Sequence, residues 1–305
     1  MKQGVRVGTR GSKLALVQTD MVVNALRRAN PGLDVTTVRI TTTGDRDQRT
    51  ELDHMAAGVF VKELETALLD GRIDVAVHSL KDVPIDVAPG LALLATLERA
   101  DPRDVLVART ELRALPSGAK IGTGSLRRAI QIRLMRPDLT PVAIRGNVDT
   151  RLGKINSGEV DGVLLAAAGL QRLSWQDRIT QYLPPEQFLP AVGQGALVIE
   201  ARADDTDTAR LVAPLNHMPT WWSTIAERAF LRTLGGGCRA PIGALGTVSD
   251  GVLRLEGMIA SAAGSGIVRD LMAGNHTAAD AIGVRLAERL LAMGGARFIA
   301  EAQDA

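Results

Sequence analysis

The sequence predicts an α/β protein with two or three domains. Its 305 residues are 46% hydrophobic and 23% charged, which is enough apolar material for more than one core and too little charge for a disordered chain. Over the first 95 residues, short apolar runs alternate with apolar residues at helical spacing. This strand–helix–strand alternation is typical of an α/β domain.

The first block is expected to contain three strands and two helices. The strands are short apolar or β-branched runs at Val5–Val7, Val35–Ile40 and Ile73–Val77. One helix begins after Ser12, its expected N-cap, with an apolar stripe of Leu14, Val17, Met21, Val22 and Ala25. The second helix covers Val59–Leu69 and ends at Gly71. The polar stretch Thr41–Gly58 is long for a connection and predicts either a functional loop or disorder.

Two further blocks follow. Glu98–Asp104 is expected to be a linker, and the second α/β block then has strands at Asp104–Ala108, Lys120–Thr123, Pro141–Ile144 and Gly162–Ala166. Another short strand is expected at Ala196–Glu200. The third block begins near Met218, with a helix from about Trp221 to Leu234. A last helix is expected to be capped by Thr277, to end at Gly294-Gly295 and to carry Ile282, Leu286, Leu290 and Met293 on one apolar face.

Composition excludes several classes of protein and site. The single cysteine, Cys238, excludes an internal disulfide and a multi-cysteine metal site, and the four histidines show no metal-ligand spacing. With 3% aromatic residues and no dense basic run, nucleic acid is not an expected partner. No apolar run approaches the roughly 20 residues that span a bilayer, and the N-terminus lacks a signal-peptide pattern. We therefore expect a cytoplasmic protein without a membrane partner.

Three expected strands are each followed by hydroxyl or cationic residues. Arg10 and Ser12 follow the first strand, Thr123–Arg128 follows a strand of the second block, and Arg145–Arg151 follows the next. Free backbone N–H groups at helix starts favour anions, and two adjacent arginines there, with no acid nearby, are unfavourable unless an anion binds. Each segment alone can be an N-cap with solvated charges. Together they favour a polyanionic ligand, because ligands of α/β sheets bind at the carboxyl ends of strands.

Two further features can carry chemistry. Lys81 and Asp82 follow the apolar strand that ends near His78, and form either an acid–base pair or a turn before Pro84. Cys238 follows three glycines and precedes Arg239, a cation that favours the nucleophilic thiolate. A lone cysteine is usually a core residue, but this glycine-rich loop also fits a covalent attachment point.

The order of these motifs resembles the porphobilinogen deaminase (hydroxymethylbilane synthase) family. The resemblance runs from about residue 5 to 245 and rests on GTRGSKLALVQ, VFVKELETALLDGRIDVAVHSLKDVP, ERADPRD, GTGSLRR, RGNVDTRL, AAAGLQRL, LPAVGQGA and GGGCRAPIG. It implies an ammonia-releasing polymerisation of four porphobilinogens to hydroxymethylbilane on a dipyrromethane primer. It further implies a thioether between that cofactor and Cys238, and Asp82 as the catalytic carboxylate.

The resemblance also implies domains and binding residues. Two lobes like those of type-2 periplasmic binding proteins are expected at 1–97 plus 196–216 and at 98–195, with a small α+β cofactor-attachment domain at 217–305. Besides Cys238 and Asp82, the implied cofactor-binding residues are Ser79, Lys81, Thr123, Ser125, Arg127, Arg128, Arg145 and Gly146. Substrate binding is implied for Arg10, Ser12, Gln18, Arg145, Arg151, Arg172 and Gln194. We expect a monomer that needs no metal.

One departure and two alternatives remain. The family commonly has a lysine in a glycine-rich run before the Phe-Val-Lys-Glu-Leu-Glu helix, whereas Asp53–Gly58 here lacks it, and His54 is a weak candidate replacement. A two-lobed polyanion-binding protein without catalysis is the first alternative, against which the GGGC loop and the third domain argue. A cysteine-dependent transferase is the second, and it lacks a base near Cys238.

Overall fold

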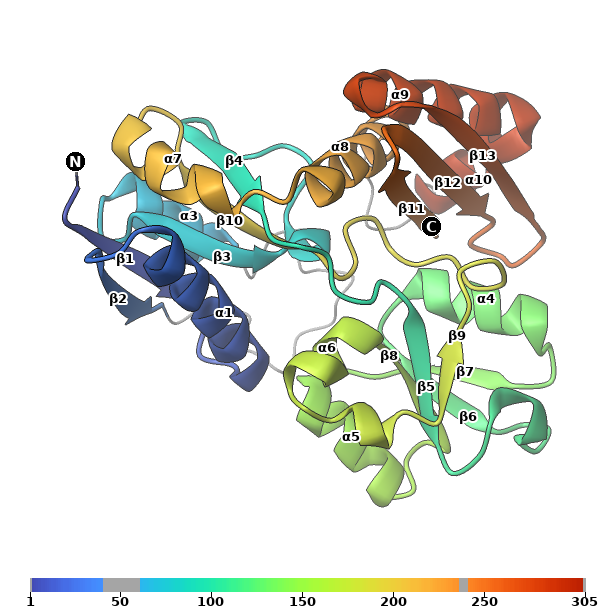
Figure 1. Ribbon diagram of the computed structural model, residues 1–305. Helices are drawn as coiled ribbons and strands as arrows, with labels where there is room; N and C mark the ends of the chain where they lie inside the picture. The colour runs from blue at the N-terminus through green and yellow to red at the C-terminus, as the bar shows by residue number, and fades with distance from the viewer. Residues whose placement is uncertain (1, 41–60, 236–240, 304–305) are drawn as a thin grey trace. The chain divides into compact units, whose positions relative to one another are not determined.

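The computed structural model describes residues 2–40, 61–235 and 241–303. The expected mixed α/β fold is confirmed: the described residues form two five-stranded mixed sheets and one three-stranded antiparallel sheet, with helices packed against them (Figure 1). The chain separates into two units, residues 1–100 with 196–221 and residues 101–195 with 222–305. The boundaries of the three expected domains stay a prediction.

The sheet of unit 1 has the order β2-β1-β3-β10-β4. Its strands are β1 (Gly4–Thr9), β2 (Asp34–Arg39), β3 (Val75–Ser79), β4 (Leu91–Thr96) and β10 (Leu197–Arg202). β1 runs parallel to β2 and β3, whereas β10 runs antiparallel to β3 and β4. The chain therefore returns to this sheet after Gly195, which the expected Ala196–Glu200 strand allowed. The sequence pattern did not indicate β4.

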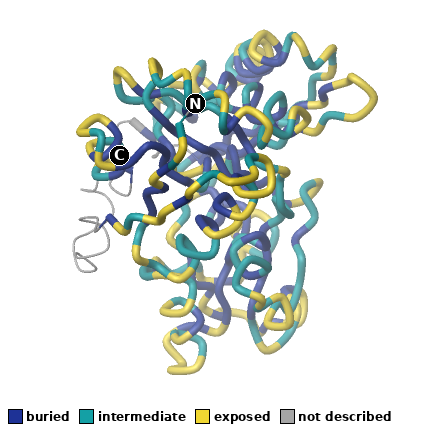
Figure 2. The backbone as a smooth tube through the Cα atoms, turned by 60° about the vertical axis from the view of Figure 1, so that its left-hand side comes forward, coloured by how far each residue is buried: buried dark blue, intermediate teal, exposed yellow. Residues whose placement is uncertain are grey.

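Helices cover both faces of this sheet. α1 (Lys13–Ala29) and α7 (Thr206–Val212) pack on one face, where Val22, Leu26 and Val212 join the apolar residues of β1 and β3. α3 (Lys62–Leu69) packs on the other face, where Leu64 and Leu68 are fully buried. Figure 2 shows buried stretches of backbone in the interior and exposed stretches mainly at the outer turns. Both faces of the sheet are therefore buried against helices.

The first helix begins as predicted, but its buried face differs. Ser12 is the N-cap, and its side chain accepts a hydrogen bond from the Ala15 N–H at 3.3 Å. Met21, placed on the apolar stripe, is exposed. The buried residues are Gln18, Thr19, Val22, Val23 and Leu26. Two polar residues are buried because each has a hydrogen-bond partner inside the unit, which hydrophobic spacing alone does not reveal.

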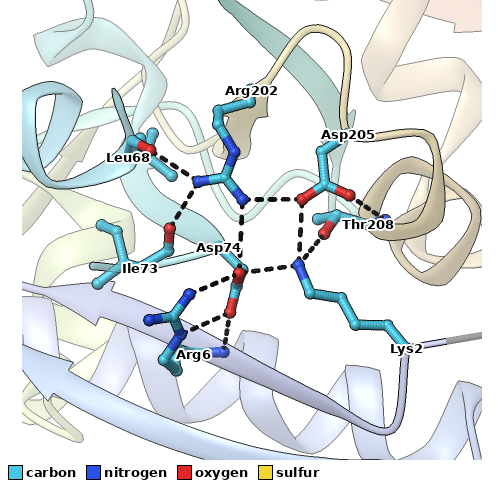
Figure 3. Close-up of polar contacts among 8 residues, drawn as sticks. All are labelled: Lys2, Arg6, Leu68, Ile73, Asp74, Arg202, Asp205 and Thr208. Atoms are coloured by element: carbon cyan, nitrogen blue, oxygen red, sulfur yellow. Dashed lines mark hydrogen bonds and ion pairs between the residues drawn. The ribbon is translucent and has the colours of Figure 1, made fainter. Parts of the chain in front are cut away.

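A charge network joins the start of β3 to the end of β10 (Figure 3). Asp74 accepts hydrogen bonds from the backbone and side chain of Arg6 at 2.8 and 3.0 Å and from Lys2 at 2.8 Å. Arg202 donates to Asp205 at 2.9 Å and to the carbonyls of Leu68 and Ile73. Although burial raises it, the hydrogen bonds of Arg6 and Lys2 hold the pKa of Asp74 far below its usual range.

The larger sheet of unit 2 has the order β7-β6-β8-β5-β9. Its strands are β5 (Asp104–Ala108), β6 (Lys120–Thr123), β7 (Thr140–Ala143), β8 (Gly162–Ala166) and β9 (Gln181–Leu183). β6 is parallel to β7 and β8, and β5 is antiparallel to β8 and β9. The helices are α4 (Leu126–Met135) on one face and α5 (Val148–Asn156) and α6 (Ala167–Arg172) on the other.

The third sheet consists of β11 (Ile242–Ser249), β12 (Val252–Ala260) and β13 (Ile267–Asn275). Around its core are the helices α8 (Met218–Thr233), α9 (Ala279–Leu290) and α10 (Ala296–Gln303). The buried carboxylate of Glu227 on α8 accepts hydrogen bonds from the N–H groups of Gly193 at 2.6 Å and Gly246 at 2.7 Å.

Two details of the last helix were predicted wrongly. Thr277 is not the N-cap of α9, because it lies in a short 3₁₀ turn whose own cap is Asn275. Met293 is half exposed rather than buried. It lies beyond the end of α9, next to Gly294, where a φ of +105° breaks the helical backbone before α10 begins. Ile282, Leu286 and Leu290 are buried, as predicted.

Candidate active site

In unit 1, the predicted site residues lie at one edge of the sheet. β1 and β3 are parallel neighbours, so their last residues, Thr9 and Ser79, lie at the same edge. The Nε2 amide of the buried Gln18 on α1 donates to the Oγ of Ser79 at 2.9 Å. The predicted residues that this edge brings together are Arg10, Ser12, Gln18, Ser79, Lys81 and Asp82.

Asp82 lies on a short anchored turn at the end of β3. Leu80–Asp82 form a single 3₁₀ turn. The Leu80 N–H donates to the Ala196 carbonyl at 3.0 Å, and the Val83 N–H donates to the Leu80 carbonyl at 3.1 Å. Leu80 and Val83 are buried, whereas Lys81 and Asp82 are exposed. The turn interpretation is therefore correct for the backbone, and this turn presents both charged side chains at the sheet edge.

A buried histidine–glutamate pair includes the second residue before this turn. The Nε2 of His78 on β3 is 3.0 Å from the Oε2 of Glu200 on β10, and both side chains are almost fully buried. The Oε1 of Glu200 is buried and has no hydrogen-bond partner. Burial raises the pKa of Glu65 on α3, and the charge of the nearby Glu200 raises it further. His78 lowers it in part.

Unit 2 presents its cationic segments at one sheet edge as well. β6, β7 and β8 are mutually parallel, so the residues that follow them share an edge. These are Thr123, Ser125, Arg127 and Arg128 after β6, Arg145, Gly146 and Arg151 after β7, and Arg172 on α6 after β8. The buried Thr123 accepts a hydrogen bond from the Ser125 N–H at 3.1 Å, which shapes the start of α4.

Arg127 and Arg128 have an acidic neighbour, so the expectation that no acid lies near them was wrong. Both are 5% exposed and both pair with the fully buried Asp104. The shortest distances are 2.7 Å from Arg127 and 2.6 Å from Arg128 to its carboxylate oxygens. Gln194, also fully buried, donates to the same carboxylate at 2.9 Å. Asp104 reaches this edge because β5 is antiparallel to β8, which places the start of β5 where β8 ends.

This edge carries more positive than negative charge. Although burial raises it, the charges of Arg127 and Arg128 lower the pKa of Asp104 to about 2. One carboxylate thus balances two guanidinium groups. Burial lowers the pKa of Arg172 to about 10, and no ion pair joins Arg172 to a described acid. Its Nε is buried without a partner, and its terminal NH2 donates to the Gly195 carbonyl at 2.7 Å.

The segment that follows β7 is held by a hydrogen bond from a side chain of α5. The Arg151 Nε donates to the Gly146 carbonyl at 2.8 Å. Gly146 has a φ of +100°, and a Cβ there would lie 2.6 Å from the Thr150 side chain. Only glycine fits this turn, which explains the Arg145-Gly146-Asn147 spacing before α5.

Some predictions lie outside the described residues. Cys238, the expected attachment point, is one of them, and so are His54 and the rest of the Asp53–Gly58 segment. Within the described ranges, no cluster of three histidine, cysteine or acidic side chains is suited to hold a metal ion. Over the same ranges, no helix is long and apolar enough to cross a membrane.

Sequence analysis missed Asp104, His78 and Glu200 as site residues. Asp104 was placed both at the end of the charged ERADPRD linker and at the start of the Asp104–Ala108 strand, and a charge that opens an otherwise apolar strand is a usable signal. His78 and Glu200 belong to strands that are far apart in the chain. Only the β3–β10 register, in which His78 faces Val198, brings them together.

Comparison with known proteins agrees with the sequence motifs. Residues 5–210 match the family model described as porphobilinogen deaminase, dipyrromethane cofactor binding domain, and residues 221–292 match its C-terminal domain. A porphobilinogen deaminase of Roseiflexus sp. is 49% identical over 98% of this chain and 100% of its own length. That of Syntrophobacter fumaroxidans is 47% identical over 97% of both chains. Among solved structures, the Bordetella pertussis BvgS periplasmic VFT2 domain is 15% identical, with a TM-score of 0.42 over 70% of this chain and 86% of that one.

Proposed function

The chain belongs to the porphobilinogen deaminase family, and from that premise we propose that Asp82 is its catalytic carboxylate and Cys238 its site of dipyrromethane attachment. The family reaction joins four porphobilinogens head to tail, releasing ammonia at each addition and hydroxymethylbilane at the end. Membership of this enzyme family excludes the alternative of a binding protein without catalysis.

The observation that carries the proposal is the excess of positive charge beside β6 and β8. Porphobilinogen and the dipyrromethane both bear acetate and propionate groups, so a growing chain brings many carboxylates. Arg127 and Arg128 share one acid, and Arg172 has none among the described residues. Guanidinium forks are suited to such carboxylates. These donors fit the dipyrromethane, and we assign its carboxylates to Thr123, Ser125, Arg127, Arg128, Arg145 and Gly146.

Residues of unit 1 fit the reacting end. We assign pyrrole contacts to Ser79, Lys81 and Asp82 for the cofactor. Substrate carboxylates and ring groups are assigned to Arg10, Ser12 and Gln18, together with Arg145, Arg151, Arg172 and Gln194 of unit 2. When bound, the dipyrromethane supplies the pyrrole carbon to which the next porphobilinogen is joined.

Asp82 can serve the reaction in two ways. Its exposed carboxylate, on a turn held by the Leu80 and Val83 hydrogen bonds, can accept hydrogen bonds from pyrrole N–H groups. It can also stabilise the positive charge that develops as ammonia leaves the substrate. A fixed carboxylate is effective in this role because it needs no reorganisation during the step.

The substitution Asp82→Asn tests this assignment. It keeps an acceptor oxygen of similar shape but removes the charge, so single-turnover ammonia release should fall by roughly 10²–10³. Asp82→Glu keeps the charge one methylene farther out and should retain partial activity. Equal cofactor loading is confirmed first by intact mass. Turnover of Asp82→Asn at the parent rate would make this carboxylate structural.

Two finer proposals concern the state of the protein. We propose a monomer that works in the cytoplasm, with porphobilinogen as its small-molecule partner and neither nucleic acid nor membrane. The balanced charge and low aromatic content argue against a nucleic-acid partner. Sedimentation equilibrium across a range of concentrations tests the monomer, since a concentration-dependent mass would contradict it.

A further inference from the structure

We propose that Glu200 and His78 form a positioning pair that holds the turn bearing Asp82. This inference rests on the proposed role of Asp82. The two residues come from β10 and β3, and their side chains meet at 3.0 Å inside the core of unit 1. Neither side chain is exposed enough to contact substrate, so their effect must pass through the strands that carry them.

The connection to the turn is short and continuous. His78 faces Val198 and Ser79 faces Leu197 in the β3–β10 ladder. The next hydrogen bond runs from the Leu80 N–H to the Ala196 carbonyl. The β3–β10 pairing therefore extends one residue into the 3₁₀ turn. Contacts that fix the last paired residues of the two strands also fix the position of Asp82.

Glu200 lies beside a bulge in the neighbouring strand. Ile199 pairs with Ala95 and Glu200 with Leu93, so the extra residue belongs to β4. Such bulges are enriched beside active sites. Glu200 itself is a fully buried carboxylate with His78 as the partner of one oxygen and no partner for the other. A buried carboxylate is held by its few partners, because leaving it unpaired is costly.

β3 and β10 are fastened at both ends, which provides a matched control. At the far end, Asp74 precedes β3 and is 3.5 Å from Arg202, the last residue of β10 (Figure 3). Toward the end next to the turn, the His78–Glu200 pair joins the same two strands. Only the near end adjoins the turn. Removing either the Asp74–Arg202 or the His78–Glu200 contact should destabilise unit 1. Only removal of the His78–Glu200 contact should displace Asp82.

The experiment compares Glu200→Ala, Glu200→Gln and Asp74→Ala in the full-length, cofactor-loaded enzyme. A displacement of about 1 Å in a catalytic group can cost about 100-fold, so single-turnover ammonia release by Glu200→Ala should fall by about that factor. Glu200→Gln keeps an oxygen that can accept from His78 and should recover most of the loss. Asp74→Ala should stay within about threefold of the parent, because distant sites act independently.

A second readout follows the turn itself. Amide hydrogen exchange of Leu80 should speed up by at least about tenfold in Glu200→Ala and be unchanged in Asp74→Ala. If Glu200→Ala does not fold, His78→Gln, which retains an amide donor, is measured in the same way and should show a smaller loss with the same exchange pattern.

The outcomes separate this inference from the proposed function. Equal slowing by Glu200→Ala and Asp74→Ala would show that the pair contributes only stability and would overturn the inference. Parent-like turnover and Leu80 exchange in Glu200→Ala, or in His78→Gln if that is the variant that folds, would overturn it too. In either case, a slow Asp82→Asn variant leaves the proposed function intact, whereas a fast one removes the proposed function itself.

Discussion

Asp104 is the acid on which the arginine cluster of unit 2 depends, and Asp104→Asn measures that dependence. The substitution removes the only carboxylate that pairs with Arg127 and Arg128 among the described residues. Their charges lower the pKa of Asp104 from 3.8 to about 2 despite burial, which corresponds to about 2 kcal/mol in favour of the folded state. Breaking a buried ion pair typically costs about 3–5 kcal/mol.

An asparagine keeps one acceptor oxygen, so we expect a loss of about 2–4 kcal/mol in the free energy of unfolding. Urea unfolding at pH 7 measures it. The control is Glu159→Gln in the same unit, which breaks an exposed ion pair with Lys154 and should cost at most about 1 kcal/mol. If the two variants share one midpoint and one slope, Asp104 does not hold the arginines and the account of this edge is wrong.

Three further predictions concern Arg172, the network of Asp74 and Asp205, and Gly146. Arg172→Gln removes a half-buried cation that no described acid balances, so the free energy of unfolding should stay equal or rise while the KM for porphobilinogen increases about tenfold or more; a lower stability with unchanged KM would contradict this. The pKa values of Asp74 and Asp205 are lowered, that of Asp205 to about 2, so their ionised forms stabilise the fold above the unfolded pKa near 3.9. Acid titration of the urea midpoints should show this contribution disappearing as pH falls toward 2, and a flat profile in the parent, or an equally steep one in Asp74→Asn, would count against the network. Gly146→Ala forces a left-handed backbone and a clash with Thr150, and should lower stability by more than about 1 kcal/mol in thermal unfolding, whereas an unchanged midpoint would show that the turn adapts.

Much of the fold could be predicted from local patterns. β5, β6 and β8 have the bounds that their apolar runs indicated. β4 was missed because Leu91–Thr96 is rich in leucine and alanine, which favour helices, and becomes a strand only through pairing with β10. The buried face of α1 was misjudged for a related reason: Gln18 is inside because Ser79 accepts its hydrogen bond.

The candidate site shows the same division. Motifs located the segments that follow the parallel strands, because the carboxyl ends of such strands share an edge. They could not locate Asp104 or the His78–Glu200 pair, because both depend on antiparallel strands whose register is set by distant parts of the chain. The buried pairs of ionisable side chains are therefore the part of this site that could be located only from the structure.

The attachment of the cofactor is the central claim, and denaturing mass spectrometry of the purified, active protein tests it most directly. The intact mass should exceed the sequence mass by one covalent two-pyrrole group, and digestion should map that group to the peptide containing Cys238. Cys238→Ser should lack both the added mass and activity. An active parent enzyme with an unmodified Cys238 would contradict the account.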